Sequence, residues 1–139
     1  MPITPAKAKK QPDSITPAFP RDTPEETILV EISGWRSEAV TSALRLSNDG
    51  RLSPSAQAAF WSLGQSALLS CTRIDDLWYE ILAVIKPGEL NRYLEIAKAA
   101  AEICATAKLQ PTPESVSRAY EALGAANDVL ASLLDRSAA

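Results

Sequence analysis

Residues 53–87 read SPSAQAAFWSLGQSALLSCTRIDDLWYEILAVIKP, and this stretch decides the fold. Its apolar and small residues recur at alternating spacings of four and three, the 3.5-residue period of a helix-packing seam. A strand repeats every two residues and would scatter the same set over both faces. Ser53 suits an N-cap and Pro54 suits the first helical turn, so one helix is predicted over about 54–86. The members of the seam are Phe60, Gly64, Ala67, Cys71, Ile74, Trp78, Ile81 and Ile85.

This helix would be unusually long, about 50 Å at about 1.5 Å per residue, and it needs partners along its whole length. Its second half carries large apolar residues beside the seam and is expected to be covered on several sides. Its first half is rich in alanine, serine and glycine, which allow a neighbouring helix to come close. A capping signal at residues 72–75 or a kink at Gly64 leaves a broken helix as the alternative.

Another helix is predicted upstream, over about 24–46. Thr23 is its cap, Pro24 occupies its first position, and Glu26 is placed to close a capping box. The sequence Asn48-Asp49-Gly50 is interpreted as the turn that follows this helix.

Two more helices are predicted downstream. Lys86-Pro87-Gly88 separates the long helix from one over about 89–109, and Thr112 opens the last helix, over about 113–135. Asn127 interrupts the apolar seam of the last helix. It either fixes the register of packing from a buried position or points to the edge of the seam.

The chain is therefore expected to be all-α: an antiparallel helical bundle of about four helices with one unusually long helix, preceded by a disordered tail. The tail is expected over 1–23 and the bundle domain over 24–139. No strand is predicted, because β-branched residues never cluster in alternation. The long helix exceeds the others, and its surplus must project, bend or pack on another chain. A homodimer is the first expectation for oligomeric state.

The two parts of the chain differ in charge. Residues 1–23 contain five prolines, four cations and two carboxylates, so their net charge is +2. Because the whole chain has a net charge of −3, residues 24–139 have a net charge of −5. Such a tail cannot bury enough apolar surface to order itself. It is either a docking arm, through Lys7, Lys9 and Lys10, for an acidic partner, or a solubilising leader. Nucleic acid is not an expected partner, because the acidic body would repel phosphates.

The sequence lacks the residues that several kinds of catalysis and cofactor binding require. Histidine is absent, which excludes histidine ligation of haem, histidine phosphotransfer and histidine general-base catalysis. Cys71 and Cys104 match no zinc spacing and are interpreted as buried free thiols, a disulfide being conceivable if their helices are adjacent. The acidic residues Asp75, Asp76 and Glu80 are interpreted as a solvated face paired partly with Arg73. No phosphate loop or dinucleotide fingerprint is present, so no enzyme and no cofactor are expected.

Location is inferred from the absence of targeting signals. No apolar run approaches the ~18 residues of a membrane span, and residues 1–10 are too polar for a signal peptide. A cytoplasmic protein without a membrane partner is therefore expected.

Protein binding is the function that remains. Trp61 lies on the flank of the long seam, where a tryptophan is more often partly buried packing; the alternative is that, beside Phe60, it forms an exposed aromatic patch that contacts a partner. Leu68 suits a contact in which a helix docks in a groove. The predicted function is a non-enzymatic interaction module, an adaptor, chaperone-like protein or neutralising partner, acting through this surface and the tail. The alternative is a bundle that binds a small apolar ligand between its alanine-rich helices.

Overall fold

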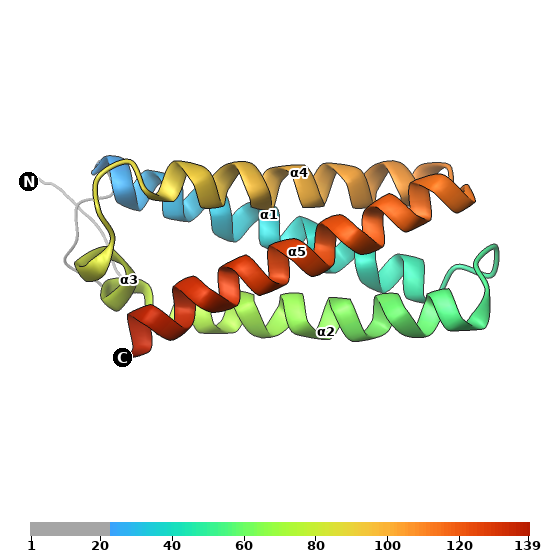
Figure 1. Cartoon of the computed structure of the whole chain (residues 1–139), viewed down its shortest axis with the longest axis horizontal. Helices are drawn as coiled ribbons and strands as arrows, with labels where there is room; N and C mark the ends of the chain where they lie inside the picture. The colour runs from blue at the N-terminus through green and yellow to red at the C-terminus, as the bar shows by residue number, and fades with distance from the viewer. Residues whose placement is uncertain (1–22) are drawn as a thin grey trace, which may run out of the picture.

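The computed structural model describes residues 23–139, and within them it contains helices and no strand. Four long helices run side by side, and a short fifth helix lies across one end of the bundle (Figure 1). Their bounds are α1 Pro24–Ser47, α2 Pro54–Asp76, α3 Trp78–Val84, α4 Leu90–Leu109 and α5 Pro113–Ala138. The predicted all-α bundle is confirmed for this part of the chain. None of its described helices is long and apolar enough to cross a membrane.

The four long helices occupy the corners of the bundle. α1 packs against α2 and α4, and α5 packs against the same two helices, so α2 and α4 lie at opposite corners (Figure 1). The hairpin pairs α1–α2 and α4–α5 run antiparallel, as predicted. The pairs α1–α4 and α2–α5 run parallel, which the sequence did not predict. The cause is the connection after α2, which crosses the end of the bundle and returns the chain beside α1.

The helix predicted over 54–86 is divided in the structure. α2 ends at Asp76, Leu77 leaves helical geometry with φ −106° and ψ 19°, and α3 turns across the end of the bundle. The broken-helix alternative is therefore the one observed, although the break falls at neither of the two predicted positions. A straight helix would carry its last ten residues about 15 Å beyond the bundle. The bend instead buries Ile81 and Ile85 against the end of the core.

A buried carboxylate fixes α3 to the start of α1. The capping box predicted at Thr23 is wrong, because the Thr23 side chain makes no cap hydrogen bond. Glu26 is instead buried, and its Oε2 accepts a hydrogen bond from Nε1 of Trp78 at 3.0 Å. The caps predicted at Ser53 and Thr112 are confirmed. The Ser53 hydroxyl accepts from the backbone N–H of the third residue of α2, and Thr112 forms a complete capping box with Ser115. At the other end, α5 runs three residues further than predicted.

The core consists of two apolar clusters stacked along the bundle. The cluster beside α3 is built mainly from large side chains, namely Leu29, Ile32, Ile74, Ile81, Ile85, Leu90, Tyr93, Ala97, Leu130, Leu133 and Leu134. The cluster toward the α1–α2 loop is richer in alanine and contains Ala39, Val40, Ala43, Leu46, Leu52, Phe60, Ala67, Ala101, Cys104, Ala107, Ala119 and Leu123. Small residues bring helices together there, as predicted: a Cβ on Gly64 would lie 2.9 Å from Cδ2 of Leu44.

Candidate functional site

A polar layer separates the two apolar clusters at the middle of the bundle. Arg36 of α1 is 0% exposed, and its Nε and Nη2 donate to Oγ of Ser70 on α2 at 3.2 and 3.1 Å. Nη2 also donates to Oδ1 of Asn127 on α5. Asn127 in turn donates from Nδ2 to the carbonyl oxygen of Leu63 at 3.1 Å. Asn127 therefore points inward and joins α5 to both α1 and α2.

The charge of Arg36 has no carboxylate to balance it. None of the ion pairs within residues 23–139 includes Arg36, and its buried Nη1 has no hydrogen-bond partner there. Burial lowers the pKa of Arg36, and burial also raises the pKa of Cys71 and raises that of Cys104 to about 11. Both cysteines are free, as predicted, and both thiols are neutral at pH 7. Because no atom of Arg36 reaches the surface, the layer positions helices rather than a ligand.

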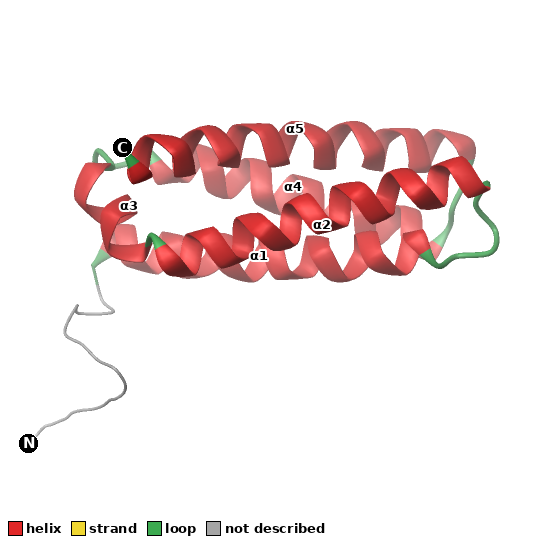
Figure 2. Ribbon diagram, turned by 90° about the horizontal axis from the view of Figure 1, so that it is seen from below, coloured by secondary structure: helices red, strands yellow, loops and turns green. Residues whose placement is uncertain are grey.

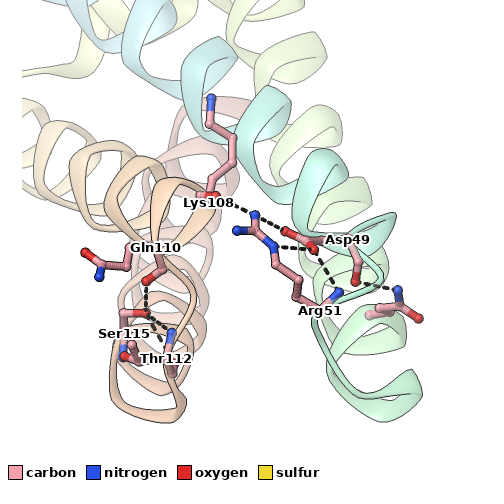
Figure 3. A network of polar contacts seen from close by, with 7 residues as sticks. Asp49, Arg51, Lys108, Gln110, Thr112 and Ser115 are labelled. Atoms are coloured by element: carbon pink, nitrogen blue, oxygen red, sulfur yellow. Dashed lines mark hydrogen bonds and ion pairs between the residues drawn. The ribbon is translucent and has the colours of Figure 1, made fainter.

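A second polar network ties together the two hairpin loops at the end opposite α3 (Figure 3). The carboxylate of Asp49 accepts hydrogen bonds from the Arg51 backbone at 2.9 Å and from its guanidinium at 3.0 and 2.7 Å. The same guanidinium donates to the Lys108 carbonyl oxygen at 3.2 Å. The hydrogen bond from Arg51 lowers the pKa of Asp49. These groups bind one another and hold the predicted turn against the end of α4.

Metal and small-molecule chemistry gain no support from the described residues. Among residues 23–139, no three histidine, cysteine, aspartate or glutamate side chains are grouped so that they could hold a metal ion. Arg73 pairs with Asp135 of α5 at 3.0 Å rather than with the acidic residues near it in sequence. A hollow of about 140 Å³ opens between α4 and α5, smaller than the roughly 300 Å³ at which small-molecule sites begin. It is lined by Ile103, Thr106, Ser115 and Arg118.

The exposed side of α2 differs from the polar layer, the loop network and the hollow, because it carries a second helix-packing pattern. The buried side of α2 consists of Phe60, Gly64, Ala67, Ser70 and Ile74. On the opposite side, five exposed residues recur at spacings of three, four, three and four, the same period as an inner seam. With one exposed neighbour they form what we call the outer α2 face, namely Ala58, Trp61, Gln65, Leu68, Leu69 and Thr72.

Three large apolar side chains give this face its character. Trp61 is 56% exposed, Leu68 is 44% exposed and Leu69 is 59% exposed. Figure 2 shows α2 in front, with no other helix over it. Single exposed apolar residues are ordinary, but three within about two turns on one side of a helix form a patch typical of an interaction site.

The outer α2 face is also free of charge. No charged residue occurs from Leu52 to Thr72, whereas the exposed sides of α1, α4 and α5 each carry several. Arg73, which follows this stretch, is drawn toward α5 by its ion pair with Asp135. Depletion of charge at the centre of a surface patch is a compositional mark of protein interfaces.

Of the predicted binding residues, two are exposed on one face, one is buried, and three lie outside the described part of the chain. Trp61 and Leu68 lie together on the outer α2 face, and the exposed alternative for Trp61 is the one observed. Phe60 is a correction, because it is 1% exposed and its ring packs edge-to-face on Tyr120 with centroids 6.4 Å apart. Lys7, Lys9 and Lys10 lie outside the described residues.

Sequence reasoning missed Leu69, the most exposed large hydrophobic side chain of α2. The signal that would have found it is the charge-free stretch between Arg51 and Arg73. A helix that needs only one buried side usually carries charge on the other. No protein-family model, curated protein or solved structure matches the chain.

Proposed function

We propose that this protein is a non-enzymatic interaction module that binds another protein through the outer α2 face. One observation supports this most strongly: a water-facing helix side that is free of charge and carries Trp61, Leu68 and Leu69 about half exposed. The remaining long helices carry charges on their exposed sides, as expected of surfaces that stay in water.

The energetics favour binding at this place. Full burial of one large apolar side chain is worth about 1.5–3 kcal/mol, so covering the exposed half of each of three gives roughly 1 kcal/mol apiece. Trp61 is the aromatic member of the outer α2 face, and tryptophan is among the residue types enriched at binding hot spots. A helix of the partner, laid along α2, would contact all three side chains.

Matched photo-crosslinking tests the proposal. Ala58 on α2 and Ala99 on α4 are both exposed alanines on the outward sides of their helices, at opposite corners of the bundle. Each is replaced, in the full chain, by a photoreactive phenylalanine analogue, and the protein is irradiated at native abundance in its producing cells. We expect protein adducts from position 58 and few from position 99.

A third variant of the chain serves as the control for the crosslinking experiment. Leu69→Glu combined with the probe at position 58 should abolish the adducts, because an unpaired charge would be placed in the contact. Equal adducts from both probes, or adducts that survive Leu69→Glu, would contradict binding at this face. The contribution predicted for Lys7, Lys9 and Lys10 is tested by repeating the irradiation after deletion of residues 1–22.

A further inference from the structure

We infer that the protein seated on the outer α2 face is a second copy of this chain, with the two α2 helices antiparallel about a two-fold axis near Gln65. This inference rests on the proposed function and names the partner of the same surface. It assigns the homodimer expected from the sequence to one face of one helix.

The order of residues along α2 is self-complementary about Gln65. In an antiparallel pair centred there, residues four positions before and four after the axis meet, so Trp61 of one copy lies over Leu69 of the other. Leu68 of the second copy lies beside the same indole ring. Ala58 and Thr72, seven positions either side, meet at the ends and are small enough for close approach. Both copies therefore supply the same large and small side chains in matching places.

Gln65 itself suits a position on the axis. Its side-chain amide has both a donor and an acceptor, so two copies related by a two-fold axis can satisfy each other. A single polar residue in an otherwise apolar seam fixes register and orientation in helix pairs.

Charge selects the antiparallel direction. Asp75 and Asp76 are exposed at the end of α2, and in an antiparallel pair they lie beside the other copy's α2 N-terminus. That end carries the positive end of the α2 helix dipole. Arg51, which precedes it, is ion-paired with Asp49 of its own chain and does not add to this attraction. In a parallel pair, Asp75 and Asp76 of one chain would lie beside the same two aspartates of the other chain and would repel them.

Cysteine crosslinking of the full chain tests this register. Gln65→Cys places a thiol on the proposed axis and should give a disulfide-linked product of twice the chain mass on mild oxidation. Ala58→Cys alone and Thr72→Cys alone should give little product, because like positions lie about 21 Å apart along the antiparallel pair. An equal mixture of these two proteins should crosslink at least tenfold more than either alone. The unchanged chain, with its two native thiols, supplies the background.

Each outcome decides a different point. No product from Gln65→Cys above background overturns the second copy as partner. Crosslinking of Ala58→Cys with itself as strong as in the mixture indicates a parallel pair of copies and overturns the antiparallel arrangement. If the photo-probe at position 58 then captures a protein of another mass, the proposed function stands and only the second copy fails. If that probe captures nothing, both fail together.

Discussion

Nη2 of Arg36 on α1 donates a hydrogen bond to Oδ1 of Asn127 on α5, between two residues 91 positions apart in the chain. The contact lies between the two apolar clusters, where the guanidinium is fully buried. A buried cation without a carboxylate depends on its neutral acceptors, because each unsatisfied group costs the full free energy of desolvation. Arg36 and Asn127 should therefore behave as one energetic unit.

A double-mutant cycle measures this dependence. Asn127→Leu leaves the buried cation short of an acceptor and should lower the free energy of unfolding by about 2–4 kcal/mol. In the double variant Arg36→Leu and Asn127→Leu, the charge is gone, and the stability should return to within about 1 kcal/mol of the wild type. Urea unfolding of the four proteins, followed by circular dichroism, gives the coupling free energy. A loss from Asn127→Leu that is the same with and without Arg36 would contradict the account.

Cys104 should make stability fall at alkaline pH. Its pKa in the folded protein is raised to about 11 from an ordinary value of 9.0 because the thiol is buried. Below pH 9 the thiol is neutral in both states, so its contribution is fully present. Above pH 9 the unfolded chain loses the proton first, and stability falls by up to about 1.4 kcal/mol per pH unit until about pH 11.

The control for this pH dependence is Cys104→Ala. The variant should be less stable overall, because a buried sulfur is removed, but its stability should fall less steeply between pH 9 and pH 11. Urea unfolding at half-unit steps of pH gives both slopes. Identical slopes for the two proteins would show that Cys104 does not titrate with a raised pKa.

Two glycines should respond in opposite ways to the same change. Gly34 lies exposed inside α1, and a Cβ there meets no atom within 4 Å, so Gly34→Ala should raise stability by about 1 kcal/mol. Gly88 has φ +82° in the turn before α4, where an alanine would be strained by about 1 kcal/mol or more. Thermal unfolding should show midpoints that move several degrees in opposite directions. A rise in both midpoints would contradict the left-handed turn.

The helices could be predicted from the sequence because caps and apolar spacing are local properties. The starts at Ser53 and Thr112 carry their hydrogen bonds as expected. The break at Leu77 could not be predicted, because no local signal marks that residue. The break depends on the length of the other helices. A straight continuation of α2 would extend past their ends and expose Ile81 and Ile85, which the bend buries. The placement of α4 beside α1 depends on the same crossing at the end of the bundle.

The polar layer was not predicted, because arginine usually faces water and is fully buried only rarely. The buried side of α1 contains Leu29, Ile32, Arg36 and Ala39 at spacings of three, four and three, so Arg36 is a regular member of that seam. Its burial depends on Ser70 and Asn127, which are distant in sequence. For the candidate site, Trp61 and Leu68 were identified from helical spacing, whereas Leu69 required knowledge of which side of α2 the other helices cover.

The outer α2 face should tolerate substitution in the isolated chain. Leu69→Glu should change the free energy of unfolding of the unassociated chain by no more than about 0.5 kcal/mol, because the side chain is 59% exposed and α2 is packed by its other side. Chemical denaturation at low protein concentration checks this. A loss of several kcal/mol would show that Leu69 supports the fold rather than a partner.

Sedimentation equilibrium of the full chain measures whether the outer α2 face binds a second copy, when Leu69→Glu is compared with Leu109→Glu. Leu109 is 77% exposed at the end of α4, at the opposite corner of the bundle, and it receives the same charge. We predict that the wild type and Leu109→Glu associate to twice the chain mass of 14.9 kDa. Leu69→Glu should associate at least about tenfold more weakly, because it buries an unpaired charge in the contact. A wild type that remains at the chain mass at every concentration, or a Leu69→Glu protein that associates as strongly as the wild type, would contradict the assignment of the outer α2 face as the binding surface for a second copy.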